Sequence, residues 1–327
     1  MTVRRRQRGQ RGAAILMAML TVTLVATFAA AAMWQQWRAV EVEAAERSRI
    51  QASWVLTGAL DWARLILRED GRTAGDHLAE PWAVPLEEAR LSTFLAADRN
   101  ASSSESDSDN AFLSGQIIDQ QSLLNVRNLV DGNRVSEAGL RSFQRLFEQL
   151  SLPQAQLTRL AESLRFALDT SADNRSGSQA PLLPQQVGQL VWLGLPAPTV
   201  AVLQPYITVL PTRTPVNLNT ASAQVIHAAI DGLSLADAQA LVAHRGSQPF
   251  RSLADASRLF AGHEQAFTTD AVSVASGYFE VIGRLRLDQV MVEERSLVQR
   301  TNMNVTTLQR QRGVADASAL VAAPPMR

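Results

Sequence analysis

The side chains best suited to chemistry lie in two acidic stretches. Asp76, His77 and Glu80 combine an imidazole with two carboxylates, which is half of a metal site. Asp107 and Asp109 lie in a segment rich in serine and acid, residues 98–110, and Ca²⁺ prefers carboxylate oxygens, but the rest of an EF-hand is absent. We therefore favour an ordinary loop histidine and a flexible, solvated surface loop, and the metal ligands stay unknown.

No catalytic constellation is recognisable in the 327 residues. The chain has no cysteine, which excludes thiolate nucleophiles, disulfides and cysteine-ligated metals. It also lacks a glycine-rich phosphate loop, an HExxH motif and a G-x-S-x-G motif. Two of its four histidines, His227 and His244, fall on separate predicted helices, where structural roles are commoner than metal binding. The sequence therefore predicts no catalytic residues and a protein that is not an enzyme.

Residues 215–262 have the pattern of a helix-hairpin-helix unit, which in DNA-binding proteins holds phosphate on hairpin amides. That use favours several glycines in the hairpin, and here only Gly232 is present. Three arginines and three aspartates between 217 and 260 sum to zero charge, whereas a DNA-binding patch is basic. We interpret the unit as a packing module that binds no nucleic acid. The alternative function is that of a membrane-anchored, exported DNA-binding protein.

The strongest pattern lies at the amino end. Five arginines precede Gly12, and no charged residue follows between Ala13 and Trp37. The 21 residues from 13 to 33 form a helix of about 32 Å, enough to cross a hydrocarbon core of about 30 Å. Trp34 and Trp37 suit the membrane interface, and the arginines hold the amino end in the cytoplasm. This pattern predicts a single-pass membrane protein whose carboxyl-terminal domains are exported.

Three interpretations of this stretch compete. A plain membrane anchor requires only the apolar helix. A secretory signal peptide cut near residues 29–32 would have suitable small residues, but its apolar core of typically 7–15 residues is shorter than this one. A type IV prepilin-like leader is cut at Gly12, before the apolar run, and leaves the helix on the mature protein as anchor and polymerisation surface. The rest of the chain decides between them.

A second helical pattern follows the membrane segment. Leu56, Leu60, Ala63 and Leu67 recur on one face, and the pattern ends near Gly71. One helix from residue 13 to 70 would be about 87 Å long, which is expected of a filament subunit that packs by its stem. Cleavage after Gly12 leaves 26 basic and 31 acidic residues, a net charge of −5, which gives no basis for binding nucleic acid or anionic lipid.

The remaining chain predicts an α+β fold. Residues 72–97 are irregular, 112–126 have the pattern of a β-hairpin, 136–262 are mainly helical, and 271–298 form short antiparallel strands. Strands that flank helices indicate a helical domain inserted into a β-containing one. The predicted divisions are a leader at 1–12, a transmembrane and stem helix at 13–71, the first α+β part at 72–130, an inserted helical domain at 131–265, a second β part at 266–312 and a flexible tail at 313–327.

The chain resembles the minor pseudopilin K family of type II secretion systems over most of its length. The resemblance rests on the Gly12–Ala13 leader and on six short runs: 58–64 (GALDWAR), 77–85 (HLAEPWAVP), 115–119 (GQIID), 124–130 (LNVRNLV), 216–221 (VNLNTA) and 296–300 (SLVQR). It implies a pseudopilin antiparallel sheet behind a long transmembrane helix, with a large inserted all-α domain that holds the helix-hairpin-helix-like unit. It also implies a non-enzymatic subunit that initiates or caps the tip of the secretion pseudopilus and assists export of folded proteins across the outer membrane.

The same resemblance implies processing and partners. The prepilin peptidase would cleave after Gly12 and methylate the amino group of Ala13, and the minor pseudopilins I, J and H would be partners. No cofactor is required, although some members bind Ca²⁺, whose ligands cannot be transferred to this chain.

Most pilin-like helices carry Glu at the fifth mature position, where this chain has Met17. A lone carboxylate in a bilayer costs about 3 kcal/mol, and ordinary subunits offset it by pairing with the amino terminus of their predecessor. Met17 therefore fits a subunit that starts a filament.

Overall fold

The computed structural model describes residues 11–73, 75–92, 111–169, 179–260, 264–287 and 290–314. The chain divides into two compact units, Met1–Val55 and Leu56–Arg327. The predicted loop at 98–110 with Asp107 and Asp109, and the predicted tail beyond residue 314, lie outside the described residues.

The described part of the first unit is one helix. Helix α1 (Arg11–Asp70) begins in this unit and ends in the second, as the long helical pattern predicts. No glycine or proline occurs between residues 13 and 57, so nothing in the sequence interrupts the helix. The three threonines of the apolar stretch each donate a hydroxyl hydrogen bond to the carbonyl three residues earlier, at 2.8–3.0 Å. Their polar groups are therefore satisfied within the helix.

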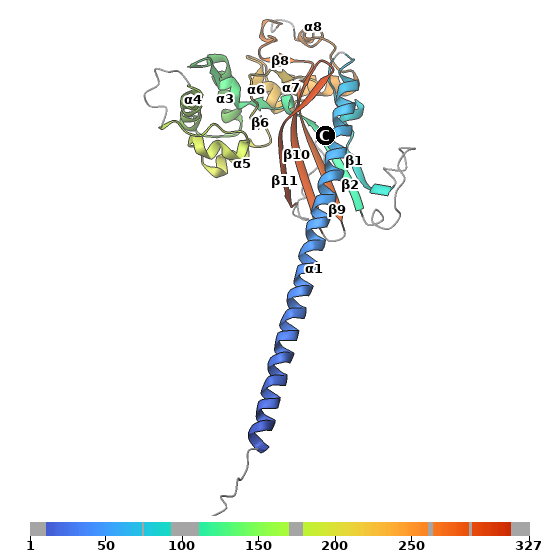
Figure 1. The fold of residues 1–327 in the computed structure, drawn as a ribbon. Coiled ribbons are helices and arrows are strands. Elements are labelled where there is room, and N and C mark those ends of the chain that lie inside the picture. Colours follow the sequence, from blue (N-terminus) through green and yellow to red (C-terminus); the bar gives the residue numbers. More distant parts are fainter. Residues whose placement is uncertain are drawn as a thin grey trace, which may run out of the picture. The chain divides into compact units, whose positions relative to one another are not determined.

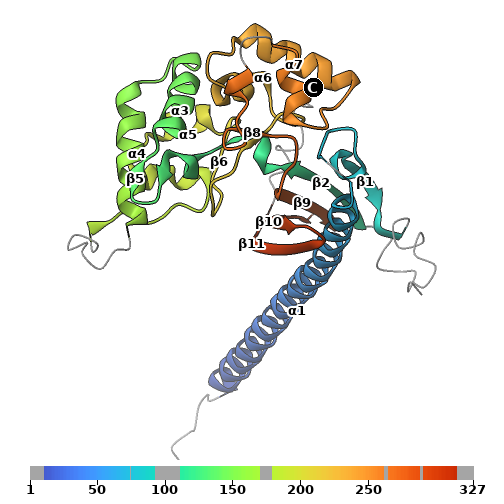
Figure 2. The same cartoon turned by 90° about the horizontal axis from the view of Figure 1, so that it is seen from above.

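The second unit contains a five-stranded antiparallel sheet in the order β1-β2-β9-β10-β11. Its strands are β1 (Leu86–Arg90), β2 (Ala111–Asp119), β9 (Tyr278–Leu287), β10 (Val290–Thr301) and β11 (Asn304–Val314). Figures 1 and 2 show β2 beside β9, although about 160 residues separate them in the sequence. The sheet thus joins the two ends of the second unit, and the helices lie between them in sequence.

The carboxyl-terminal turns of α1 pack on this sheet. Leu60, Ala63 and Leu67 form a core cluster with Val281, Val298 and Val305 of the strands, and with Trp82 and Phe279. The rings of Trp82 and Phe279 meet edge to face, with centroids 5.2 Å apart. Trp82 belongs to the 3-10 helix η1 (Pro81–Ala83), which leads into β1. The face predicted from the 3.6-residue period is therefore the face that the sheet buries.

The helical part has its own core of buried leucine, valine, isoleucine and phenylalanine side chains. Its α-helices are α3 (Glu137–Gln149), α4 (Gln154–Leu168), α5 (Ala197–Leu203), α6 (Ala223–Ala229), α7 (Leu235–Ser247) and α8 (Leu253–Ser257). Ser136 caps α3, and Ser234 with Asp237 forms a capping box at α7, both as the sequence predicts. Figure 2 shows α6 next to α7, the pair assigned to the predicted packing unit.

Short strands and 3-10 helices connect these helices. The two-residue ladders pair β3 (Leu124–Asn125) with β6 (Ile207–Thr208), β4 (Val130–Asp131) with β5 (Arg134–Val135), and β7 (Val216–Asn217) with β8 (Val272–Ser273). The 3-10 helices are η2 (Gln120–Ser122), η3 (Val126–Leu129), η5 (Val187–Leu193) and η6 (Glu264–Ala266). Gly132 has φ +57° at the predicted turn between β4 and β5.

The structure confirms the α+β class, the long helix, the antiparallel sheet and the helices between its strands. The predicted hairpin at 112–126 is wrong, because β2 pairs with β1 and β9, and β3 pairs in parallel with β6. The strands predicted at 290–293 and 296–298 are one strand, β10. Strands β1 and β11 were missed. β11 extends to Val314, so residues 313 and 314 belong to the sheet and not to the predicted tail.

Candidate functional site

The predicted processing and assembly residues lie at the start of α1. Gly12 falls within the bounds of the helix, and Ala13 is exposed. Every side chain from residue 13 to 47 is exposed, and Met17 is 68% exposed. Apolar side chains on all sides of a helix need lipid or other protein around them, because water solvates them poorly.

Trp34 and Trp37 mark the change from apolar to charged sequence. They are 60% and 61% exposed, and the guanidinium of Arg38 lies 4.9 Å from the ring centroid of Trp34. Exposed ion pairs follow along the helix, between Arg47 and Glu43 at 3.2 Å and between Arg49 and Glu46 at 3.3 Å. Among the described residues, α1 is the one helix long and apolar enough to cross a membrane, a test that a signal sequence also passes. The helix fits a membrane-anchored protein.

A buried ionic junction lies where α1 ends in the second unit. Arg300 of β10 donates hydrogen bonds to the Asp70 carboxylate at 2.6 Å and to the Asp76 carboxylate. It also donates to the backbone carbonyl of Ser276 at 3.0 Å. Its guanidinium lies 4.9 Å from the ring centroid of Phe279. The side chain of Arg300 is 8% exposed, so both ion pairs are shielded from water. One arginine thus ties the end of α1 to the loop that follows it and to the sheet.

Asp119, at the end of β2, forms the second half of the junction. Its Oδ2 accepts hydrogen bonds from the hydroxyls of Thr220 and Ser276, both at 2.6 Å, and from Asn217 Nδ2 at 3.1 Å. Its Oδ1 accepts the backbone N–H of Gln121 at 2.7 Å. The three side-chain donors come from β7, from the segment after it and from the segment that precedes β9. Asp119 therefore connects the sheet to the start of the α6–α7 region.

Burial determines the protonation of this junction. Desolvation raises the pKa of Asp119 to about 6, despite the hydrogen bonds from Ser276, Thr220 and Gln121 that oppose it. Desolvation also raises the pKa of Asp70 to about 7, with repulsion from Glu80 and Asp76 adding to the effect and Arg300 opposing it. Repulsion from Asp76 adds to the rise in pKa at both Asp70 and Asp119, so the negative charge of Asp76 opposes the ionisation of both.

The predicted metal half-site lies at the edge of this junction. Carboxylate oxygen atoms of Asp70, Asp76 and Glu80 lie within 4.8 Å of one another, close enough to bind one cation together. In this fold the guanidinium of Arg300 supplies the positive charge to Asp70 and Asp76. Glu80 accepts hydrogen bonds from the backbone N–H of His77 at 2.9 Å and from Trp82 Nε1 at 2.7 Å. His77 Nε2 is 3.8 Å from Glu80 Oε1. These side chains have protein partners, and we assign no metal to them.

The α6–α7 region uses its polar side chains for packing. His227 Nδ1 lies 2.7 Å from the carbonyl oxygen of Leu233, and His244 stacks on Phe250 with ring centroids 5.4 Å apart. Arg245 donates to the carbonyl of Leu218, and burial lowers the pKa of its guanidinium to about 10. An arginine held in this way is not presented to a nucleic-acid backbone.

The junction was not predicted from the sequence, although most of its residues lie in the short runs that carry the family resemblance. Asp119 ends the run 115–119, Asn217 and Thr220 lie in 216–221, Arg300 ends 296–300, and Glu80 lies in 77–85. Four separated runs therefore converge on one place in the fold. One signal in the sequence could have indicated the junction: a charged or amide side chain within or beside an otherwise apolar strand. Such a side chain is buried with the strand and therefore needs a hydrogen-bond partner.

Comparisons with known proteins find similarity over most of the chain. A family model described as type II secretion system protein K matches residues 216–275, and a second model of the same description matches residues 122–212. Type II secretion system protein K of Pseudomonas aeruginosa is 28% identical, with 93% of this chain and 90% of that protein covered. The crystal structure of a GspK-GspI-GspJ complex from the type II secretion system of enterotoxigenic Escherichia coli matches with a TM-score of 0.63 and 19% identity, over 82% of this chain and 98% of that one. At this identity the last match shows the fold.

Proposed function

This chain belongs to the type II secretion system protein K family and is a minor pseudopilin, and from that premise we propose that it occupies the tip of the secretion pseudopilus. In this role it initiates or caps the filament and so assists export of folded proteins across the outer membrane. The observation that carries the proposal is the helix from Ala13, exposed and apolar on every side, with Met17 in place of a carboxylate. A subunit without a predecessor needs no charge to pair with the preceding amino terminus.

The proposal includes the partners of the helix. The solved GspK complex contains GspI and GspJ, and we extend that assembly to the I and J pseudopilins of this chain's own system. We place the amino end in the cytoplasm, the apolar part of α1 in the inner membrane and the second unit in the periplasm. The role is structural and needs no cofactor.

Processing at Gly12 and Ala13 is part of the same proposal. Cleavage there removes the five arginines of the leader and leaves the whole apolar stretch on the mature chain. An anchor that keeps its leader has cytoplasmic charges fixed to the helix, and these oppose its extraction from the membrane into a filament.

The test replaces the residue before the cut. Gly12→Val is expected to leave the leader attached, to stop co-purification with pseudopilins I and J in detergent, and to abolish secretion in the native cells. Gly9→Val, which changes a leader glycine away from the cut, is the matched control and should behave as wild type. Normal assembly and secretion by an uncleaved Gly12→Val chain would contradict the proposal.

A further inference from the structure

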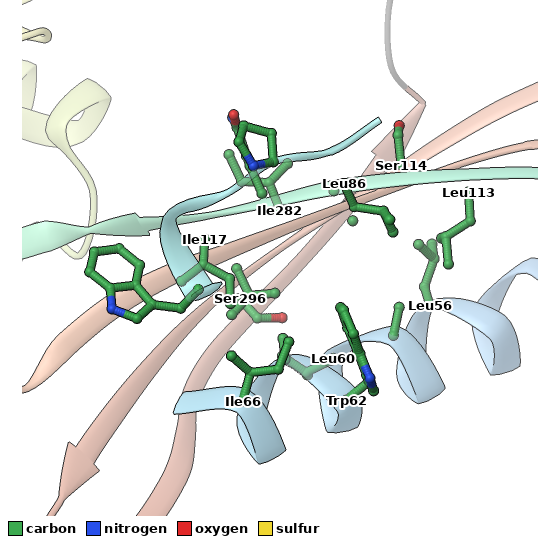
Figure 3. A pocket seen from close by; sticks show the side chains of 18 of the residues that line it. Leu56, Leu60, Trp62, Ile66, Leu86, Leu113, Ser114, Ile117, Ile282 and Ser296 are labelled. Carbon is green, nitrogen blue, oxygen red and sulfur yellow. The ribbon is translucent and has the colours of Figure 1, made fainter. Parts of the chain in front are cut away.

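Two separate apolar cores lie in the second unit. One is formed by the helical part, and the other lies between α1 and the sheet; among the described residues, no buried side chain belongs to both. Figure 3 shows part of the second core, where Leu60 and Ile66 of α1 lie opposite Ile117 of β2. Each part therefore has apolar packing of its own, and the contacts that attach one part to the other lie between the two cores.

Polar contacts connect the two parts. Gln121 of η2 donates from Nε2 to the carbonyl oxygen of Pro215 at 3.1 Å, and its Oε1 accepts the backbone N–H of Gly277 at 2.6 Å. The hydroxyl oxygens of Thr212 and Tyr278 lie 2.9 Å apart. Pro215 and Thr212 precede α6, whereas Tyr278 begins β9. An attachment made of hydrogen bonds depends on the protonation state of the groups that form it.

Asp119 lies at the centre of this attachment. It is 3% exposed, and its carboxylate accepts hydrogen bonds from uncharged donors, three of which are the side chains of Asn217, Thr220 and Ser276. The fourth is the backbone N–H of Gln121. Among the described residues, Asp119 forms no ion pair with an arginine. An ionised Asp119 is therefore a buried charge without a bound cation, which is unfavourable.

Asp76 faces Asp119 from the loop after α1. Ser276 joins the two carboxylates, because its backbone N–H donates to Asp76 Oδ2 and its hydroxyl donates to Asp119 Oδ2, both at 2.6 Å. Burial raises the pKa of Asp119 to about 6, and repulsion from Asp76 adds to the effect. Ionisation of Asp119 thus places a second negative charge on the other side of one serine.

The remaining charged side chains near the junction are engaged with one another or with the backbone. They are Arg300 of β10, paired with Asp70 and Asp76; Glu80, with its Oε1 3.8 Å from His77 Nε2; and Arg245 of α7, which donates to the carbonyl oxygen of Leu218. The elements that contact Asp119 directly, which are η2, β7 with the segment after it and the segment before β9, contribute the uncharged donors. The charge of an ionised Asp119 is therefore not neutralised by these groups.

The hydrogen-bond partners of Asp119 fit its neutral form as well. A protonated Asp119 can donate its O–H to Thr220 Oγ1, because the hydroxyl hydrogen of Thr220 can turn to the carbonyl oxygen of Asn217, which lies 3.5 Å from Oγ1. Rotation of one hydroxyl group thus accommodates the proton. The neutral form keeps its partners, whereas the ionised form leaves a buried charge without a cation.

We propose that Asp119 is a proton-dependent switch that controls whether the α6–α7 region is held rigidly against the sheet. With the proton bound, the two parts move together. Ionisation favours a state in which the α6–α7 region, with Asn217 and Thr220, moves away from Asp119 and water solvates the charge. Each part keeps its own core in both states. The inference concerns the second unit alone and does not depend on the place of the chain in a filament.

The test measures the distance between the two parts. The chain has no cysteine, so two introduced cysteines can carry spin labels at chosen sites. Leu308→Cys on β11 and Gln239→Cys on α7 replace exposed side chains. Double electron–electron resonance on the full-length chain in detergent then gives the distance distribution between the labels at about pH 5 and pH 8. We expect a narrow distribution at the lower pH and a broader one at longer distance at the higher pH, with a midpoint near pH 6.

Asp119→Asn separates this side chain from the other titratable groups. The amide is uncharged at every pH, so the labelled variant should keep the narrow distribution at both pH values. Ala155→Cys on α4 with Gln239→Cys is the matched control, because α4 and α7 belong to the same core and their distance should not change with pH.

Two results would overturn the inference. One is a distribution between β11 and α7 that is the same at both pH values in the chain that retains Asp119, a comparison that holds whether or not the Asn variant folds. The other is a pH-dependent change that persists in Asp119→Asn, because another group would then be responsible.

Discussion

Arg300→Met is expected to destabilise the second unit by about 3–5 kcal/mol, the cost of removing one partner from a buried ion pair. The substitution keeps much of the apolar volume of the side chain but removes the charge that Asp70 and Asp76 share. It also removes the donors to the Leu67 and Ser276 carbonyls. Since domains are stable by about 5–15 kcal/mol, the loss is a large fraction of the total.

Urea unfolding of the full-length chain in detergent micelles, followed by tryptophan fluorescence, measures this loss. Arg72→Met is the control, because Arg72 pairs with Glu69 at 3.1 Å with both side chains more than 60% exposed. An exposed pair contributes less than about 1 kcal/mol. Because Arg300 lowers the pKa of Asp70, its removal raises that pKa above the wild-type value of about 7. The difference between the variant and wild type should therefore be largest at alkaline pH, where Asp70 is ionised in both, and should shrink as the pH falls to about 7. A loss at Arg300 no larger than that at Arg72, or one independent of pH, would refute the account of the junction.

Two further predictions concern the same unit. Asp119 has its pKa raised to about 6 in the fold, so its contribution to stability is fully present below about pH 4 and is lost as the pH rises through 6. Relative to Asp119→Asn, wild type should therefore lose about 3 kcal/mol of unfolding free energy between pH 4 and 7, and parallel pH profiles would count against this prediction. Gly139→Ala in α3 places a Cβ 2.0 Å from the carbonyl oxygen of Asn128, and should cost at least about 1–3 kcal/mol in urea unfolding. An unchanged midpoint would show that α3 and η3 move apart freely.

Local signals predicted the helices well. The face of α1 that carries Leu60, Ala63 and Leu67 follows from the 3.6-residue period, and Ser136 and Ser234 cap helices by bonds within one turn. Such features depend on residues a few positions apart, which a single sequence displays directly.

Strand pairing depended on contacts that no local signal records. The turn residues after Asp119 resemble a hairpin, yet β2 pairs with β9, about 160 residues later. β1 was missed because its sequence, LEEAR, is too polar to resemble a strand and lies at the edge of the sheet. β11 was missed because its exposed side chains alternate weakly.

The junction was unpredictable for the same reason. Arg300, Asp76 and Asp119 are distant in sequence, and each resembles a surface residue until the fold buries it.

The most direct test of the central claim is the intact mass and amino-terminal sequence of the protein from membranes of its own cells. The account predicts a mature chain that begins at methylated Ala13 and retains the whole of the apolar helix for assembly. A chain that begins after Ala32, or one that still begins at Met1, would contradict it.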